Sequence, residues 1–455
     1  QQDTPVPPGD HAPNAEEQTL DSLWAAPPGE VWYPFNAFGA PAPPDTTTFL
    51  FRHATVWTNG AQGIVGNTDV LVHEGRIAAI GRDLDPAVCF AGKARPSVVE
   101  VEARGMHLTS GIIDEHSHIA IERGVNEGGQ ANTAEVRVGD VVDPDDIDIY
   151  RNLAGGVTAV QQLHGSANPI GGQSSLIKLR WGRSAEAMHI AGSAPFIKFA
   201  LGENVKQSTS ENGTRYPRTR MGVEQIMFDG FHRARDYDRQ WQAWRSLAKP
   251  PARGRHTVPE PAVPAPRRDL ELDAMAEILR GERFITCHSY VQAEVLMLMR
   301  LADSLGFRVN TFTHILEGYK VADKIRQHGA SASTFSDWWA YKFEVYDAIP
   351  YNAALLHDAG VNVCINSDDA EMSRRLDQEA AKTMKYGGSS EEEAWKTVTL
   401  NPAKALHLDA RMGSVEVGKD ADLVLWSANP LRIDARCRMT LVDGVPYYDA
   451  ERDRS

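Results

Sequence analysis

Two histidines, His116 and His118, stand two residues apart in the stretch GIIDEHSHIA, residues 111–120. In a β-strand, side chains alternate between the two faces, so both imidazoles point to one side and Ser117 points to the other. Two neutral imidazoles on one face can hold a metal ion. The alternative is a pair of polar histidines where a strand meets a loop, and the rest of the chain has to decide between these interpretations.

Other polar residues interrupt apolar runs near their ends. Lys198 lies in FIKFALG, His288 in TCHSY, His314 in FTHILEG and Asp368 in INSDD. Each residue alone is typical of a core histidine, a surface lysine or a capping carboxylate. Together with the histidine pair they form a set of four histidines, one lysine and one aspartate. Imidazole and carboxylate are good zinc ligands, so the set predicts two divalent ions, with Asp368 also able to take a proton.

Lys198 poses a separate question, because an ammonium group beside two cations would be repelled. Burial and nearby positive charge lower the pKa of a lysine, and the free amine can then add carbon dioxide. The resulting carbamate is an anion that can bridge two metal ions. The alternatives are that Lys198 reaches solvent, that Glu203 in LGENVK is the bridging carboxylate, or that Lys178 in LIKLRW takes this place.

These side chains need a scaffold that brings the ends of several strands together. The middle of the chain alternates strand patterns with helix patterns such as LELDAMAEILRG and VQAEVLMLMRLADSLG. This alternation predicts a parallel (β/α)8 TIM barrel, which carries its chemistry at the C-terminal ends of the strands. The eight candidate strands are residues 111–119, 156–164, 174–181, 195–202, 283–290, 307–315, 329–336 and 361–368.

The two ends of the chain have a different sequence pattern, with short predicted strands joined by turns. We therefore predict a small composite β-sandwich domain built from both termini, residues 46–108 and 412–455, around a barrel at 109–411. Residues 1–45 are rich in Pro, Gly and Ala and predict an extended N-terminal arm whose aromatic residues dock on the body. An insertion near 204–270 contains one expected helix and a Pro-rich surface loop.

Bulk properties exclude some classes of function. The chain has 455 residues and a net charge of −14, which disfavours nucleic-acid and anionic-membrane binding. The four cysteines have no CxxC spacing, so neither a thiolate zinc site nor a disulfide framework is expected. No apolar run approaches the ~18 residues of a membrane span. The first residues could follow a removed signal peptide, so the expected location is periplasmic or secreted, with cytoplasmic as the alternative.

The motifs in this order resemble the amidohydrolase superfamily, metal-dependent hydrolases with a (β/α)8 barrel and a composite β-sandwich. The resemblance covers residues 46–447 and is nearest to the imidazolonepropionase-like and prolidase-like branches. It rests on GIIDEHSH, His288, His314 and NSDD, and on the flanking segments DVLVHEGRIAAIG and NPAKALHLDARMGSVEVGKDADLVLWSANPL. The chain departs from the family in having LTSG where a Pro-Gly is usual, and a long insertion between Lys198 and His288.

The resemblance implies a binuclear metal centre. His116, His118, carbamylated Lys198 and Asp368 would hold one ion, and Lys198, His288 and His314 the other. The ions would be zinc, with manganese, iron or cobalt as alternatives. The implied reaction is cleavage of a C–N bond of an amide, peptide or cyclic amide by a metal-activated hydroxide, with Asp368 as the proton shuttle.

Further residues are candidates for the pocket around this centre. His164, before the Gly-rich loop GSANPIGG, could donate to a substrate oxyanion, and Tyr290 faces the same way as His288 if the strand continues. Arg218 and Arg220 could clamp a substrate carboxylate. The expected partner is a small-molecule or short peptide-like substrate, and a homo-oligomer is left open.

Two other functions remain open at this point. The first is a mononuclear deaminase or imidazolonepropionase-like cyclic-imide hydrolase, in which Lys198 carries no carbamate and one ion sits on His116, His118, His288 and Asp368. The second is a ligand-binding barrel with an inherited metal site and no catalysis. The number of metal ions per chain separates the first from the binuclear enzyme.

Overall fold

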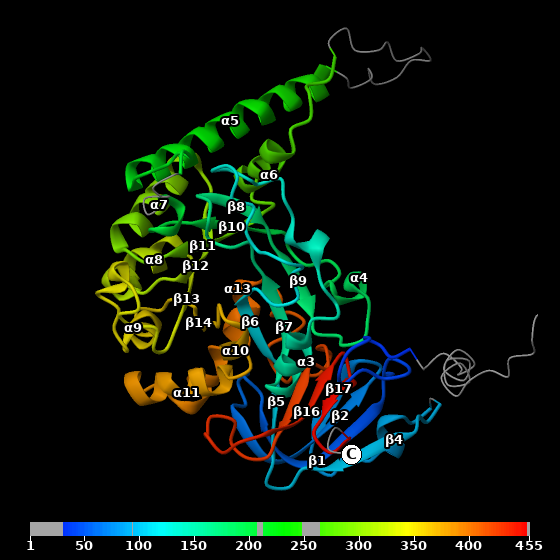
Figure 1. Ribbon diagram of the computed structural model, residues 1–455. Coiled ribbons are helices and arrows are strands. Elements are labelled where there is room, and N and C mark those ends of the chain that lie inside the picture. Colours follow the sequence, from blue (N-terminus) through cyan, green and yellow to red (C-terminus); the bar gives the residue numbers. More distant parts are fainter. Residues whose placement is uncertain (1–30, 93, 207–212, 248–263, 453–455) are drawn as a thin grey trace, which may run out of the picture.

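The computed structural model describes residues 31–92, 94–206, 213–247 and 264–452 of the chain. It is a mixed α/β protein, as the sequence predicts, with a sheet from the two ends of the chain beside a larger α/β body (Figure 1). No helix in these residues is long and apolar enough to cross a membrane.

The sheet at the chain ends combines strands from both termini. It has eight strands in the order β17-β16-β15-β5-β1-β2-β3, with β4 also paired to β1. The N-terminal part supplies β1 (Thr48–Trp57), β2 (Ile64–His73), β3 (Arg76–Gly81), β4 (Val98–Glu102) and β5 (His107–Ser110), and the C-terminal part supplies β15 (Leu423–Trp426), β16 (Cys437–Val442) and β17 (Val445–Asp449).

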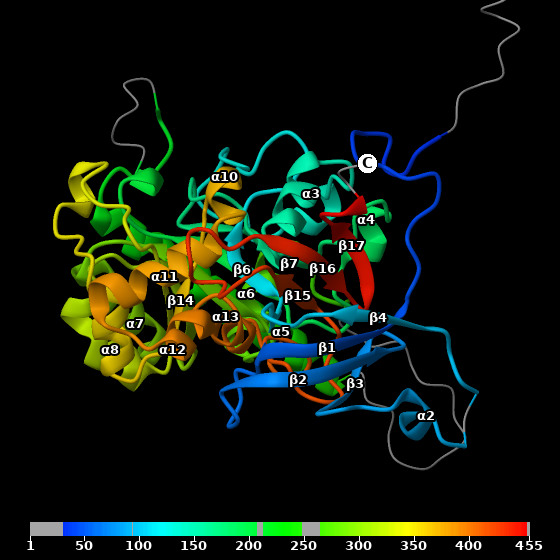
Figure 2. The same ribbon diagram turned by 90° about the horizontal axis from the view of Figure 1, so that it is seen from below.

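The two chain ends meet where β5 pairs antiparallel with β15. β1 has a left-handed backbone at His53 (φ 58°); before it β1 pairs with β4, and after it with β5. The expected sandwich is therefore one hydrogen-bonded sheet that changes partners along β1 (Figure 2). One face buries a cluster that includes Phe51, Val72 and Leu423.

The larger body contains the remaining strands in two groups. One group has the order β6-β7-β9 and the other β14-β13-β12-β11-β10-β8. Their bounds are β6 (Ile112–Ser117), β7 (Val157–Gln162), β8 (Ile170–Gln173), β9 (Ser175–Lys178), β10 (Phe196–Ala200), β11 (Phe284–Ser289), β12 (Val309–His314), β13 (Ser331–Thr334) and β14 (Val363–Ile365).

The third expected strand differs from the prediction of eight parallel strands. Within residues 174–181 only Ser175–Lys178 form a strand, β9, which runs antiparallel to its neighbour β7. β8 lies just before this range, in the segment expected as a Gly-rich loop, and runs antiparallel to β10. Only residues 163–169 separate β7 from β8, and a parallel crossover needs about a dozen residues or more, so the chain has to turn back on itself. In the described residues the two groups do not close into one continuous ladder, although β8 and β9 are joined through Ser174.

Helices cover the outside of this body. The α-helices are α2 (Pro86–Cys89), α3 (Ile147–Ala154), α4 (Ala185–Met188), α5 (Arg220–Leu247), α6 (Leu270–Leu279), α7 (Gln292–Leu305), α8 (Ala322–His328), α9 (Asn352–Asp358), α10 (Ala370–Ser373), α11 (Leu376–Gly387), α12 (Glu391–Lys396) and α13 (Leu400–Ala405). Short 3-10 helices lie at η1 (Val138–Val141), η2 (Asn204–Lys206), η3 (Gly318–Val321) and η4 (Phe343–Val345).

Capping residues are found at the ends of two of the helices that the sequence predicts. The Asp269 side chain accepts a hydrogen bond from the Leu272 amide at the start of α6, and Gly306 ends α7 in the left-handed region at φ 82°. The helix expected in the insertion is α5, which packs against α6 and α7 at the top of Figure 1.

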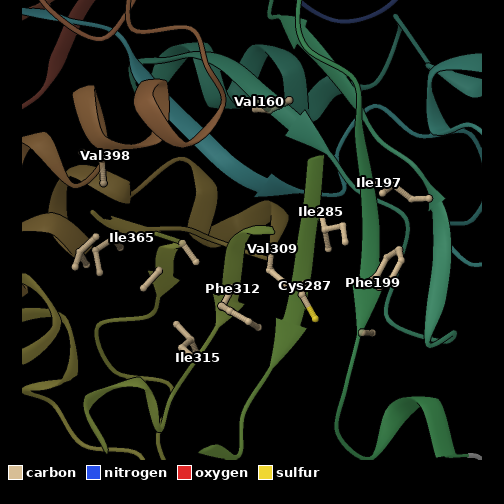
Figure 3. Packing of buried hydrophobic residues seen from close by; sticks show 14 of the residues in the cluster. Val160, Ile197, Phe199, Ile285, Cys287, Val309, Phe312, Ile315, Ile365 and Val398 are labelled. Carbon is tan, nitrogen blue, oxygen red and sulfur yellow. The ribbon is translucent and has the colours of Figure 1, made fainter. Parts of the chain in front are cut away.

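Alternation along the central strands divides their side chains between two sides. Ile197, Phe199, Ile285 and Cys287 belong to the apolar core between strands and helices (Figure 3). The residues between them, which include Lys198, therefore face the opposite side of the sheet. Polar side chains are thereby gathered on the inner side while the outer side packs against helices.

The described part of the N-terminal arm makes few aromatic contacts. The Phe38 ring stacks on Tyr150 with centroids 4.6 Å apart, and its carbonyl accepts a hydrogen bond from the Trp181 indole. Trp32 and Phe35 are exposed, so the expected docking of the aromatic residues holds only for Phe38. Residues 1–30 of the arm and parts of the insertion lie outside the described residues.

Candidate metal centre

The two histidines at the end of β6 point at one carboxylate. The Nε2 atoms of His116 and His118 lie 3.0 Å and 2.9 Å from Oδ1 of Asp368. Their Nδ1 atoms are used elsewhere: His116 Nδ1 is 2.8 Å from the Thr313 hydroxyl, and His118 Nδ1 is 2.9 Å from the Leu163 carbonyl oxygen. One ligand atom from each of the two histidines and Asp368 lies within 4.8 Å of the others.

These contacts determine which ring nitrogen carries the proton. A carbonyl oxygen can only accept, so His118 carries its proton on Nδ1 and presents a lone pair at Nε2. The Thr313 hydroxyl donates to Glu115 Oε1 at 3.4 Å and therefore accepts from His116 Nδ1, which leaves a lone pair at His116 Nε2 as well. Two lone pairs aimed at a carboxylate oxygen repel each other unless a cation lies between them. This donor set fits a divalent metal ion.

Two further imidazoles extend the group. The His288 and His314 ring centroids lie 3.9 Å apart, and His314 Nε2 is 3.3 Å from Asp368 Oδ2. The Ser166 hydroxyl lies 2.7 Å from His288 Nδ1. Among the described residues, Nε2 of His288 and both ring nitrogens of His314 are buried without a hydrogen-bond partner. A buried polar atom without a partner is costly, and a second metal ion would satisfy these nitrogens.

Lys198 lies inside this group of histidines. Its side chain is fully buried and Nζ is 3.0 Å from His116 Nε2. Burial lowers the pKa of Lys198 to about 8, so roughly a fifth of the amine is neutral near physiological pH, far more than for an exposed lysine. A neutral, buried amine beside metal ligands is the chemical form that can react with carbon dioxide.

Burial also controls the charges of the ligands. Burial holds the pKa values of His116 and His288 well below the usual range of a histidine, and it lowers that of His314. Burial alone would raise the pKa of Asp368, but the neighbouring imidazoles hold it well below the usual range of an aspartate. Neutral imidazoles around an ionised carboxylate are the protonation states that metal binding requires.

Two ligand positions adopt backbone conformations that side chains rarely take. His314 has φ 65° and Asp368 has φ 51°. Such residues cost roughly 1–3 kcal/mol each and cluster at functional sites. At His314 the left-handed backbone breaks the alternation of β12, so the consecutive side chains of Thr313 and His314 both contact His116.

Comparisons with known proteins bear on this centre. The family model described as "Amidohydrolase family" matches residues 314–448. Amidohydrolase tasK of Hapsidospora irregularis is 29% identical over 437 residues, which cover 88% of this chain and 43% of that protein. The crystal structure of an amidohydrolase from Thermotoga maritima MSB8 covers 88% of this chain and 100% of its own, with 29% identity and a TM-score of 0.77. Residues 314–448 thus match the amidohydrolase family model, and the chain is similar to amidohydrolases over 88% of its length.

A more distant likeness concerns the fold alone. A prolidase complexed with N-methylphosphonate-L-proline covers 88% of this chain and 99% of its own, with 16% identity and a TM-score of 0.52. The chain spans less than half the length of the curated relatives it matches.

Some residues expected in the amidohydrolase centre have other contacts. His164 Nε2 accepts a hydrogen bond from the Glu127 amide at 2.8 Å, and His164 Nδ1 lies 2.9 Å from the Gly165 carbonyl oxygen. Both ring nitrogens are therefore engaged with backbone, and no N–H is left for a substrate oxyanion. The Glu203 carboxylate makes no ion pair with the histidines in the described part of the chain, whereas its amide donates to Glu344.

Three basic residues are also placed away from the histidines. Arg218 donates to the Gly213 carbonyl and is exposed. Arg220 forms ion pairs with Glu294 at 3.1 Å and Glu344 at 3.5 Å, so its charge is already compensated. Lys178, the weaker alternative to Lys198, is wrong as a bridging residue because its amine lies among three aspartates at the junction with the terminal sheet.

Tyr290 does lie beside the centre. Its ring centroid is 4.6 Å from that of His288 and 5.1 Å from that of His314, and its hydroxyl accepts a hydrogen bond from Tyr341 at 2.9 Å. Burial raises the pKa of Tyr290, so its hydroxyl stays protonated and can donate. The Lys342 ammonium lies 4.0 Å from the centroid of the Tyr290 ring.

The supporting residues Ser166, Thr313 and Glu115 were not found from the sequence. Thr313 directly precedes His314, and a strict strand would place these two side chains on opposite faces. Ser166 lies in the Gly-rich loop after β7, and no sequence pattern marks its side chain as a partner of His288. The one available signal was their position, next to a predicted ligand or at the end of a strand.

Proposed function

We propose that this chain is a metal-dependent hydrolase that cleaves a C–N bond of an amide, peptide or cyclic amide. The observation that carries the proposal is the convergence of His116 Nε2 and His118 Nε2 on Asp368 Oδ1 while both Nδ1 atoms are occupied. The similarity to amidohydrolases supports the same class of reaction. The expected substrate is a small molecule or a short peptide-like compound.

The residues divide between two ions. His116, His118 and Asp368 would hold the first ion, His288 and His314 would hold the second, and Lys198, as a carbamate, would be a ligand to both. We propose zinc because four imidazoles and a carboxylate match its preferred ligands. When bound, such ions polarise a carbonyl group and lower the pKa of bound water from about 15.7 to about 7.

The protein side chains supply the remaining steps. The ionised Asp368 carboxylate accepts the proton of the attacking water and passes it to the leaving nitrogen. Its side chain is 19% exposed and that of His118 is 24% exposed, whereas His116 is fully buried, so the centre opens toward Asp368 and His118. The protonated Tyr290 hydroxyl is placed to orient the substrate beside His288. His164 keeps a structural role in this scheme.

A mononuclear enzyme is the second candidate. It requires that Lys198 stays an amine, whose Nζ lies 3.0 Å from His116 Nε2, instead of becoming a carbamate. In that case one ion is bound and a deaminase or cyclic-imide hydrolase is expected. As to the scaffold, we propose that β6 to β14 form the barrel of the family with its third strand reversed.

The test combines metal binding with turnover. Wild-type protein and the variants His118→Asn and Asp368→Asn are titrated with zinc and assayed on dipeptides, N-acyl amino acids, lactams and cyclic ureides. His357→Asn is the control, since the His357 side chain is 45% exposed and makes no contact with the centre. We expect about two zinc ions per wild-type or control chain and hydrolysis of at least one substrate class.

The variants decide between the candidates. Both centre variants are expected to lose at least one ion and about 100-fold or more in kcat, because a ligand and proton acceptor is removed. One ion per wild-type chain with full activity would favour the mononuclear enzyme. Unchanged zinc binding in both variants would rule out the proposed centre. Two bound ions with no hydrolysis of any class would favour the ligand-binding barrel.

A further inference from the structure

A hollow outside the metal centre is lined by four arginines. It has a volume of about 540 Å³ and lies between the end of α3, the segment from α10 to α11, and the start of β16. Both views place α3 beside α10, with β16 next to α3 (Figures 1 and 2). Its rim carries Arg151, Arg374, Arg375 and Arg436, and none of its lining residues belongs to the metal centre.

The positive charge at this rim is only partly compensated. Arg151 pairs with Asp148 at 3.0 Å and Arg374 with Glu371 at 2.5 Å. Arg375 makes no side-chain hydrogen bond or ion pair in the described part of the chain. Arg436 donates to two backbone carbonyl oxygens and forms no ion pair with a described carboxylate. Two guanidinium groups therefore lack a carboxylate partner in a chain of net charge −14.

A third donor also lacks a partner. Nε of Arg374 is buried and makes no hydrogen bond with the described residues. Gly155 allows the close approach of this segment to α3, because a Cβ at Gly155 would lie 2.4 Å from the Arg374 carbonyl oxygen. The position of Arg374 is thus constrained by backbone packing, and its guanidinium group has one hydrogen-bond donor without a partner among the described residues.

The carboxyl group in the hollow adds little negative charge. Asp377 is buried, and burial raises its pKa to about 7, although Arg436 opposes this. At neutral pH a large fraction of this carboxyl group is protonated and can donate a hydrogen bond. The Gln378 amide lines the same hollow, and Trp426, Ala435 and Cys437 give it an apolar floor.

We propose that this hollow binds a small molecule carrying a phosphoryl group. Guanidinium groups bind phosphate oxygens in a bidentate manner, and a tetrahedral oxyanion can engage several guanidinium groups at once, whereas a carboxylate offers only two oxygens. The arginines come from three separate elements around one hollow, which suits an anion with three or more oxygens. The apolar floor leaves room for the body of the molecule.

The experiment measures the binding of sodium pyrophosphate and inorganic phosphate to the metal-loaded protein by calorimetry. Malonate at the same ionic strength is the dicarboxylate comparison, and sodium chloride controls for screening. Arg375→Gln is the first variant, since the Arg375 side chain makes no hydrogen bond or ion pair with the described residues. The second variant is the double substitution Arg375→Gln/Arg436→Gln. The matched control is Arg104→Gln/Arg123→Gln, which changes two exposed arginines elsewhere on the protein.

Phosphate can also bind to metal ions, so Asp368→Asn is measured in parallel. We expect pyrophosphate binding that weakens about 5-fold or more in the single variant and 20-fold or more in the double variant, with the control and Asp368→Asn near wild type. Binding that survives in the double variant, is lost in Asp368→Asn, or is matched by sodium chloride would overturn the proposal. No binding at 10 mM, roughly the upper limit for a specific site, would overturn it as well. None of these readouts depends on hydrolysis.

Discussion

Thr313 contacts the Nδ1 side of the His116 ring and is not itself a proposed metal ligand. Its hydroxyl accepts from His116 Nδ1 at 2.8 Å and donates to Glu115. In Thr313→Val this acceptor is lost while the shape of the side chain is kept. Partners that hold a ligating histidine typically change metal affinity by about 10- to 100-fold, and we expect a loss of that size in zinc titrations.

The controls come from the same strand. Thr313→Ser keeps the hydroxyl and should retain most of the zinc affinity. Thr311→Val removes a hydroxyl from another buried threonine of β12 that makes no contact with His116, and it should bind zinc like the wild type. Equal zinc affinities of Thr313→Val and Thr311→Val would show that Thr313 does not position His116.

Asp377 makes the stability of the protein depend on pH. Burial raises its pKa from 3.8 to about 7, so the folded chain binds this proton more tightly than the unfolded chain. Stability from this group is therefore fully present below pH 3.8 and is lost as pH rises toward 7. At about 1.4 kcal/mol per pKa unit, the loss amounts to roughly 4 kcal/mol at pH 8.

Asp377→Asn removes the titration. In phosphate-free buffer its free energy of unfolding should exceed that of the wild type by a few kcal/mol at pH 8, and the gain should shrink steadily toward pH 4. Urea unfolding at several pH values measures this difference. A constant difference between the two proteins across the range would contradict the raised pKa.

Residue types and short spacings were sufficient to predict which side chains converge at this site, but not the residues that support them. The alternation of a strand places His116 and His118 on one face from their spacing alone. Ser166 and Thr313 contact His288 and His116 across 122 and 197 residues of sequence, and no local pattern carries such information. The second contact also depends on the left-handed backbone at His314, which a regular strand pattern does not contain.

At the scale of elements, apolar runs predict where strands lie better than which way they run. Even the short runs around 329–336 and 361–368 become β13 and β14. The parallel direction expected for β9 was wrong, and β8 was not expected as a strand, because the short segment after β7 leaves no room for a parallel crossover. That reversal also explains Lys178: it ends β9 next to the terminal sheet, far from the strand ends that carry the histidines.

The whole molecule depends on how the terminal sheet joins the α/β body. The backbone contributes through Gly111, whose amide donates to the Asp422 carbonyl oxygen at 2.8 Å. The charged contribution is the fully buried amine of Lys178, which lies 2.8 Å from Asp420, 2.9 Å from Asp422 and 2.5 Å from Asp443. Asp420 and Asp422 precede β15, and Asp443 follows β16. One lysine of the body therefore forms ion pairs with three aspartates in the C-terminal part of the sheet.

Lys178→Met leaves this cluster with too little positive charge. Asp420 keeps its ion pairs with Arg76 and Arg411, and Asp443 keeps Arg180, but Asp422 has no other ion pair in the described residues. Removing one partner of a buried ion pair typically costs about 3–5 kcal/mol, because the remaining charge is buried alone. We expect a loss of that size in the free energy of unfolding, measured by urea denaturation of the full chain.

The double variant Lys178→Met/Asp422→Asn separates a charge effect from a packing effect. If the unpaired Asp422 carboxylate causes the loss, neutralising it should restore a substantial part of the stability, and Asp422→Asn alone should be milder than Lys178→Met. Equal losses in Lys178→Met and the double variant would instead assign the effect to the methylene groups of Lys178. The zinc affinity of whatever fraction stays folded should remain at the wild-type level, because Lys178 contacts none of the proposed ligands, and a parallel loss of zinc would show that the terminal sheet positions the metal centre.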